Sequence, residues 1–324
     1  MVKSRRHLPQ TVAQVAVVVT VFNEQASIGA LVSSLLAQTL RPAEIIITDG
    51  GSTDDTSKIL QRLAAVHHQL KVFLVPGNRS VGRNYGVSKS SSPIIAFTDA
   101  GCQPTPSWLK ELARPFSQPS VSVVSGYYSG QATTVFELCL LPFCLVTPDK
   151  ARATEFYPST RSMAIRRRIF LQVGGFNKEN SHSEDFELAH RLKADRYYFT
   201  FAPRALVLWQ PRKKLSSAAW MFLRFAYGDM QAKILRPKVK LMAIRYLVFI
   251  YLIFLSRYLP ILYPVLLTAV IAYLSWAILK NYRYVKQPQA FFWLPVLQLT
   301  SDLAVLFGTL LGLLAIISSP TKKP

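Results

Sequence analysis

The stretch VAVVVTVF, Val15 to Phe22, is continuously apolar and rich in β-branched residues. Such a run is typical of a parallel strand that helices cover on both faces. Segments with helical spacing and further short apolar runs follow it in alternation. We expect strands at 44–48, 71–75, 93–98, 121–126 and 163–165, and helices at 27–38, 56–66 and about 81–88. This order predicts an α/β fold with a doubly wound, mostly parallel sheet.

Acidic and amide side chains stand where three of these strands end. Asn23 and Glu24 follow the first strand, Asp49 follows the second, and Asp99 follows the fourth. Such residues are also common in turns and helix caps. In open α/β sheets, however, ligands bind beyond the carboxyl ends of the strands. Asp49 and Asp99 directly follow buried strands, so we take them as candidate ligand contacts.

The composition divides the chain into a polar part and an apolar part. The 324 residues carry a net charge of +21, which favours an anionic partner. A nucleic acid is not expected, because no nucleic-acid module is visible and apolar segments follow the basic stretch directly. Three cysteines with no metal-ligand spacing (Cys102, Cys139 and Cys144) favour a reduced, cytosolic setting.

We therefore expect four segments. Residues 1–12 form a basic tail, 13–210 a catalytic domain, 211–245 basic juxtamembrane or interfacial helices, and 246–319 a membrane domain of about three spans. The basic stretch suits a membrane with anionic lipids. Charges in the loops favour three spans over two, with the catalytic domain on the cytosolic side. Asp302 inside the last span is costly unless it pairs with a basic residue of a neighbouring span.

Six motifs in order carry a specific resemblance. VVVTVFNE, IIITDGGSTDDT, GRNYG, IIAFTDAG, GGF and SEDFEL, within about residues 13–210, resemble the glycosyltransferases of family 2, which have the Rossmann-like GT-A fold. The segment FLRFAYGDMQA with the apolar segments after it is similar to the membrane-attached bacterial members. The resemblance implies a UDP- or GDP-sugar donor, a divalent cation and inversion at the anomeric carbon.

The resemblance also implies roles for individual residues. Asp49 would contact the base or ribose, with Thr20 and Glu24 beside it. Asp99 corresponds to the first acid of the family's Asp-x-Asp motif. Arg83 in GRNYG would lie near the donor phosphates, although an ordinary solvated helix arginine is the alternative. In SEDFEL, Asp185 corresponds to the general base.

The chain departs from the family at Gly101, where the second acid of the Asp-x-Asp motif is expected. Gln103 stands four residues after Asp99, and its amide oxygen is a hard ligand that Mg²⁺ or Mn²⁺ accepts. Asp99 and Gln103 could thus form a reduced metal site with water and the diphosphate. Alternatively, Gln103 is a solvated loop residue.

Together these features predict a multi-pass enzyme of the cell (inner or plasma) membrane that transfers a sugar to a lipid or glycan acceptor. The alternative is a non-catalytic GT-A-like scaffold that binds nucleotide sugars without turnover, which the glycine at position 101 favours.

Overall fold

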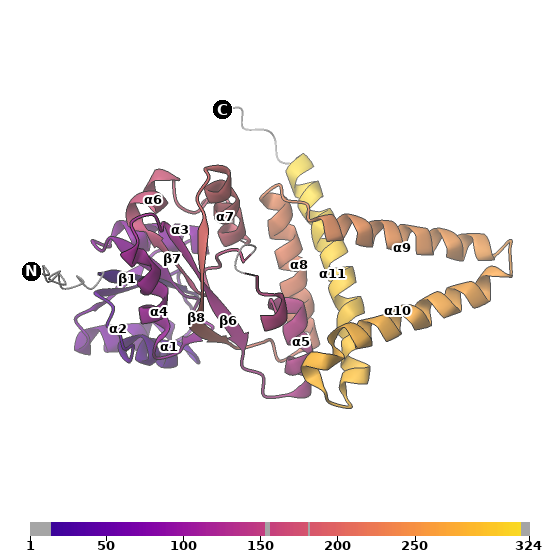
Figure 1. Cartoon of the computed structure of the whole chain (residues 1–324), viewed down its shortest axis with the longest axis horizontal. Helices are drawn as coiled ribbons and strands as arrows, with labels where there is room; N and C mark the ends of the chain where they lie inside the picture. Colours follow the sequence, from indigo (N-terminus) through magenta and orange to yellow (C-terminus); the bar gives the residue numbers. More distant parts are fainter. Residues whose placement is uncertain (1–13, 153–155, 181, 319–324) are drawn as a thin grey trace, which may run out of the picture. The chain divides into compact units, whose positions relative to one another are not determined.

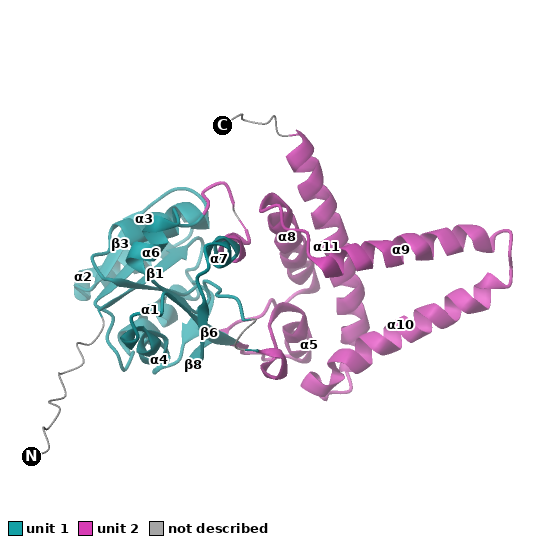
Figure 2. Ribbon diagram, turned by 45° about the horizontal axis from the view of Figure 1, so that its top comes forward, with its two compact units in different colours: residues 1–128, 152–176, 188–208 teal, residues 129–151, 177–187, 209–324 magenta. Residues whose placement is uncertain are grey.

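The computed structural model describes residues 14–152, 156–180 and 182–318, so the expected basic tail at 1–12 lies outside the described residues. The chain forms two compact units (Figure 2). The first comprises residues 1–128, 152–176 and 188–208, and the second residues 129–151, 177–187 and 209–324. The second unit therefore takes up two short segments that precede the expected boundary at residue 210.

The first unit contains an eight-stranded mixed sheet in the order β3-β2-β1-β4-β7-β6-β8-β5. The neighbours β3, β2, β1 and β4 run parallel, whereas β7 is antiparallel to both β4 and β6. The strands are β1 (Val15–Val21), β2 (Glu44–Asp49), β3 (Leu70–Leu74), β4 (Ile94–Phe97), β5 (Cys102–Pro104), β6 (Val123–Gly130), β7 (Met163–Arg166) and β8 (Phe199–Trp209).

Helices lie on both sides of this sheet, with α3 and α6 on one side and α1 and α4 on the other (Figure 1). Apolar side chains of α3, α6 and α7 share one buried cluster with the sheet residues Val18, Ile46 and Phe97. The helices that accompany the sheet are α1 (Ile28–Leu36), α2 (Thr56–Val66), α3 (Arg79–Ser88), α4 (Trp108–Ala113), α6 (Arg167–Gln172) and α7 (Glu184–Ala194). The expected doubly wound α/β architecture is confirmed, with antiparallel strands added to its parallel half.

Two glycines let α3 lie unusually close to the sheet. A Cβ atom at Gly82 would lie 2.7 Å from Thr20 Cγ2, and one at Gly86 would lie 2.6 Å from Val18 Cγ1. Contacts this short do not occur between real side chains, so any larger residue would push the helix outward. The glycines therefore set the position of α3, and with it that of Arg83 between them in the sequence.

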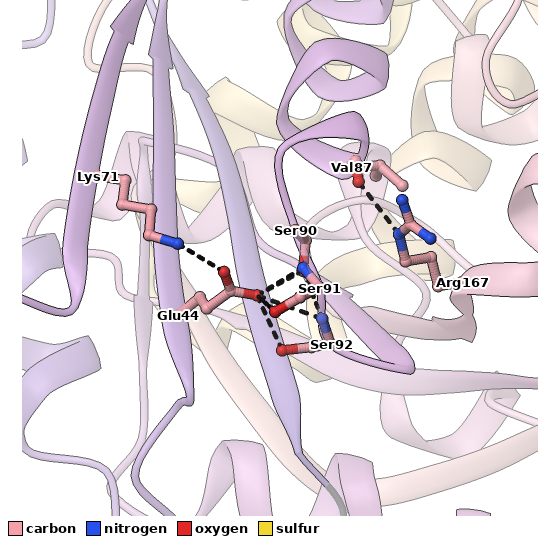
Figure 3. A network of polar contacts seen from close by, with 7 residues as sticks. All are labelled: Glu44, Lys71, Val87, Ser90, Ser91, Ser92 and Arg167. Atoms are coloured by element: carbon pink, nitrogen blue, oxygen red, sulfur yellow. Dashed lines mark hydrogen bonds and ion pairs between the residues drawn. The ribbon is translucent and has the colours of Figure 1, made fainter.

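The far end of α3 is held by a buried carboxylate at the start of β2 (Figure 3). Glu44 Oε1 accepts a hydrogen bond from Lys71 Nζ at 2.7 Å. Its Oε2 accepts from Ser90 Oγ at 2.8 Å, from the Ser91 N–H at 3.0 Å and from Ser92 Oγ at 3.0 Å. One side chain thus joins β2, β3 and the loop after α3. Burial alone would raise the pKa of Glu44, but the bonds from Lys71 and the serines outweigh it and lower the pKa to about 2.

Glu44 should make the stability of the protein depend on pH. Because its folded-state pKa is below the ordinary value of 4.5, its contribution is complete above about pH 4.5 and disappears as the pH falls toward 2. A shift of this size corresponds to about 3 kcal/mol. Thermal melts of the wild type and Glu44→Gln in detergent should differ most near neutral pH and converge toward pH 2. A difference that stays constant over this range would contradict the assignment.

The second unit is helical. Its main helices are α5 (Val135–Cys144), α8 (Leu215–Gln231), α9 (Pro237–Ser256), α10 (Leu262–Val285) and α11 (Ala290–Ser318). Three of them, α9, α10 and α11, are long and apolar enough to cross a membrane by length and composition. Helix α9 begins at Pro237, within the stretch 211–245 that was expected to be juxtamembrane. Helices α9 and α10 form a hairpin whose turn points away from α11 (Figures 1 and 2).

Glycines also allow close packing between α8 and α11. A Cβ atom at Gly308 would lie 2.3 Å from the carbonyl oxygen of Leu223, and one at Gly312 would lie 2.5 Å from Met230 Cβ. The two glycines are four residues apart and so lie on one face of α11. Small residues at this spacing let helix backbones approach each other, as in many membrane helix pairs.

Asp302 of α11 joins the three long helices. Its Oδ2 pairs with Arg245 of α9 at 2.7 Å and accepts hydrogen bonds from the hydroxyls of Tyr246 (3.0 Å) and Tyr273, which belong to α9 and α10. Its Oδ1 accepts from Gln298 at 2.9 Å. The expected pairing of Asp302 with a basic residue of a neighbouring helix is confirmed.

This network should contribute measurably to the stability of the helical unit. Tyr273→Phe removes one donor to a buried carboxylate, a loss of about 1.5–3 kcal/mol. Tyr263→Phe, on an exposed position of the same helix, is the matched control. We expect the melting temperature in detergent to fall for Tyr273→Phe and to stay unchanged for Tyr263→Phe. Equal effects of the two substitutions would show that the Asp302 network is not what holds α10 in place.

Candidate functional site

The loops that follow β1 and β2 are joined by reciprocal hydrogen bonds. The N–H of Asn23 donates to Ser52 Oγ at 2.9 Å, and Asn23 Oδ1 accepts from the N–H of Thr53 at 2.8 Å. The N–H of Glu24 donates to Thr56 Oγ1 at 2.8 Å. Asn23 has a φ of +56°, a left-handed conformation that asparagine tolerates better than most residues. The sequence-predicted residues Thr20, Glu24 and Asp49 therefore belong to two strand ends that the structure brings together.

Asp49 organises the second of these loops. Its Oδ1 accepts hydrogen bonds from the N–H groups of Gly51 (3.1 Å) and Ser52 (2.9 Å) and from Ser52 Oγ (2.7 Å). Its Oδ2 accepts from Ser57 Oγ. Burial raises the pKa of Asp49, but these four donors lower it overall. The carboxylate is therefore ionised, and it shapes the loop in addition to any contact with a ligand.

Arg83 and Asp99 form an ion pair at the edge of the sheet where β1, β2 and β4 end. Arg83 reaches from α3, is buried to 2 % exposure, and donates from Nη2 to Asp99 Oδ1 at 2.8 Å. Its guanidinium also lies over the ring of Phe176, 5.5 Å from the centroid. Asp99 keeps a 32 % exposed side chain just beyond the end of β4. The structure thus brings Arg83 and Asp99 together, and Arg83 is not an ordinary solvated helix residue.

A turn that the sequence analysis did not single out completes the surroundings of Asp99. Residues Ser159 to Ser162 form a tight turn closed by a bond from the Ser162 N–H to the Ser159 carbonyl at 2.9 Å. Thr160 hydrogen-bonds to Asp99, and the charge of Arg161 acts on the same carboxylate. Burial raises the pKa of Asp99, but the charges of Arg83, Arg161 and Arg79 and the bond from Thr160 lower it overall.

The expected metal site has few side chains that could serve as ligands. A Cβ atom at Gly101 would meet nothing within 4 Å, so an acid would fit at this position but is absent. Gln103 lies in β5 with an exposed side chain, between the buried residues Cys102 and Pro104. Among the described residues, no group of three or more His, Cys, Asp or Glu side chains is placed to hold a metal ion. The two expected ligands, Asp99 and Gln103, would supply only part of a coordination shell, so a diphosphate and water would have to supply the rest.

Asp185 is the second residue of α7, in a segment that belongs to the second unit. Its side chain is half-buried, and Oδ1 accepts a hydrogen bond from the N–H of Phe186 at 2.8 Å. The neighbouring Glu184 is buried, with 3 % of the residue exposed. Of the two adjacent acids, Asp185 is therefore the one more accessible to a substrate.

The start of α7 is anchored to the end of α8. Asp229 accepts hydrogen bonds from Ser183 Oγ at 2.9 Å and from Arg236 at 2.5 and 3.0 Å. The Arg236 guanidinium lies over the ring of Phe186, 4.5 Å from the centroid. A Cβ atom at Gly228 would lie 2.5 Å from His182 Cβ, so only glycine permits this contact. Gly228 and Asp229, part of the segment FLRFAYGDMQA, thus hold the two residues before Glu184, and Arg236 contacts Phe186, the residue after Asp185.

Two protein-family models match the chain. Glycosyl transferase family 2 matches residues 16–174, and glycosyl transferase family group 2 matches residues 106–299. Together they cover the strand ends, the turn at 159–162 and most of the helical unit.

Two curated proteins are similar to this chain over about two thirds of their own length. The succinoglycan biosynthesis protein ExoA of Rhizobium meliloti is 30 % identical over 230 residues, which are 67 % of this chain and 68 % of ExoA. The glycosyltransferase AglE of Haloferax volcanii is 28 % identical over 205 residues, 60 % of this chain and 66 % of AglE. The chain thus spans about two thirds of the length of these relatives.

A solved structure shares the fold. The mannosyltransferase PcManGT of Pyrobaculum calidifontis, solved in complex with GDP-Man and Mn²⁺, aligns with a TM-score of 0.59 and 17 % identity over 93 % of this chain and 87 % of its own. The similarity in fold agrees with the match of the family model over residues 106–299 and with the identity to ExoA. The chain belongs to glycosyl transferase family 2.

Proposed function

We propose that the chain is a membrane-bound, inverting glycosyltransferase that moves a sugar from a nucleoside-diphosphate donor to a lipid-linked or glycan acceptor at the cytosolic face of the cell membrane. The observation that carries the proposal is the buried Arg83 paired with the partly exposed Asp99, beside the joined loops after β1 and β2. The ends of β1, β2 and β4 thus offer cationic and acidic groups both for the diphosphate and for the base and ribose of one nucleotide sugar.

In this proposal, the donor contacts come from the first unit. Asp49, with Thr20 and Glu24 nearby, faces the base and ribose, while Arg83 and Asp99 face the diphosphate. Family membership and the Mn²⁺ in the PcManGT structure support the use of a divalent cation, which Asp99 and Gln103 would hold. When bound, the cation would neutralise charge on the leaving diphosphate.

Asp185 is our candidate for the general base. The acceptor hydroxyl oxygen attacks the anomeric carbon from the face opposite the diphosphate, the bond from that carbon to the diphosphate oxygen breaks, and the hydroxyl proton passes to the Asp185 carboxylate. General base catalysis of this kind contributes about 10²–10⁴-fold in rate. The half-buried side chain of Asp185 at the start of α7 supports the role.

We propose that α9, α10 and α11 anchor the enzyme in the membrane and that the acceptor approaches from the bilayer. The exposed apolar side chains of these helices support this placement. The basic residues of segment 211–245 suit anionic lipids, each contributing about 1 kcal/mol near the surface.

A donor screen tests the proposal directly. Purified protein is incubated with UDP- and GDP-sugars and a total lipid extract, and glycosylated products are identified by mass spectrometry. We expect one donor to give a product, and Asp185→Asn to lower turnover at least about a hundredfold on a hydroxyl acceptor with nucleotide affinity unchanged. Donor binding without any product would favour the non-catalytic scaffold, and full activity of Asp185→Asn would remove Asp185 from the mechanism.

The glycine at position 101 should make cation binding depend on the donor. Because three arginine charges surround the single carboxylate of Asp99, we expect calorimetry to detect tight Mn²⁺ binding only after a nucleoside diphosphate is added. Gly101→Asp adds a second carboxylate where there is room for it, so this variant should bind Mn²⁺ without nucleotide. Tight binding of Mn²⁺ to the nucleotide-free wild type, undiminished in Asp99→Ala, would refute this view.

A further inference from the structure

We propose that Arg161, at the tip of the turn Ser159–Ser162, binds the diphosphate of the donor beside Asp99. The inference rests on the proposed function and assigns a donor contact to a residue outside the motifs discussed above. Arg161 belongs to the same unit as Asp99, Arg83 and the two joined loops, so the whole contact lies within one unit.

The turn is a rigid part of the fold. The carbonyl of Arg161 accepts a hydrogen bond from Thr98 Oγ1 at 3.0 Å, so the turn is attached to the residue directly before Asp99. At its end, Ser162 Oγ donates to the Ala205 carbonyl at 3.0 Å and accepts from Trp108 Nε1 at 2.9 Å. The N–H of Gly126 donates to the Ser162 carbonyl at 2.8 Å. A turn fixed by four other segments can hold a charged side chain in one place.

The Arg161 side chain is also oriented by packing. Its guanidinium lies over the ring of Tyr128, 5.2 Å from the centroid, and the side chain remains half-buried. The Tyr128 ring thus fixes the position of the Arg161 guanidinium. Arginine prefers the oxygen pairs of phosphates because its planar fork donates two parallel hydrogen bonds.

The charge balance explains why a phosphate is the expected ligand. The charges of Arg83, Arg161 and Arg79 all act on Asp99, so this carboxylate lies among several arginines. Arg83 is committed to Asp99 at 2.8 Å, whereas Arg79 is exposed on the first turn of α3. An excess of cations at a strand end matches a ligand with two or more negative charges.

Binding of nucleotides to the full-length protein in detergent tests the inference. The affinities of UDP and GDP, and of uridine and guanosine, are measured by calorimetry in the presence of a chelator and again with Mn²⁺. The variants are Arg161→Ala, Arg161→Lys and the matched control Arg168→Ala, which removes the same charge from an exposed position of α6. Thermal melts verify that each variant is folded.

We expect Arg161→Ala to weaken binding of the preferred diphosphate by about 10- to 100-fold in chelator, since a hydrogen-bonded charge is lost. The loss should be smaller with Mn²⁺ and absent for the nucleoside. Arg161→Lys should bind with an intermediate affinity, because lysine keeps the positive charge but not the two parallel hydrogen bonds, and Arg168→Ala should bind as the wild type does. Wild-type affinity of Arg161→Ala for the diphosphate, or an equal loss for diphosphate and nucleoside, would overturn the inference while leaving the proposed function intact. A wild type that binds neither diphosphate would overturn both.

Discussion

The ion pair between Arg83 and Asp99 is the interaction on which the edge of the sheet formed by the ends of β1, β2 and β4 depends. A guanidinium with 2 % exposure is stable in a protein only when its charge is paired, and Asp99 is the carboxylate that it meets, at 2.8 Å. Contacts on both sides of Arg83 hold α3, the helix that carries it, against the sheet. Gly82 and Gly86 let α3 approach β1 and β2, and the Glu44 network holds the loop at the end of the same helix. The positioning of Arg83 therefore depends both on the two glycines of its own motif, GRNYG, and on contacts of the sheet outside that motif.

Buried charged groups with several partners also organise the helical unit. Asp229 and Gly228 hold the start of α7, and Asp302 links α9, α10 and α11 through one carboxylate. Each of these acids is largely buried and accepts several hydrogen bonds, which offsets the free energy lost on removing its charge from water. The segment FLRFAYGDMQA, for which the sequence offered only a resemblance to membrane-attached members, thus carries specific contacts.

Much of the fold could be predicted from the sequence because parallel strands buried on both faces are continuous apolar runs. The predicted limits of β1, β2 and β4 agree with the structure to within one residue at each end. The strands β5 and β8 were not predicted. β5 has only three residues, and β8 carries Pro203 and Arg204 in its middle, so neither shows the periodicity that marks a strand.

The candidate site could be predicted only in part, for a similar reason. Asp49, Asp99 and Arg83 stand out because they lie at strand ends or in a motif with local meaning. The turn at Ser159–Ser162 owes its place to partners 43 to 63 residues away in the sequence, namely Thr98, Trp108 and Ala205. Nothing in the letters STRS indicates these contacts. The loop-shaping bonds of Asp49 likewise become visible only in three dimensions, although its neighbours Ser52 and Ser57 are typical of such a loop.

The measurement that tests the central claim most directly is an experimental structure of the full chain with a bound nucleoside diphosphate. The account predicts phosphate oxygens within hydrogen-bonding distance of the Arg161 guanidinium and next to the Arg83–Asp99 pair, with the base toward Asp49. A nucleotide bound elsewhere, or a diphosphate that contacts neither Arg161 nor the Arg83–Asp99 pair, would contradict the account.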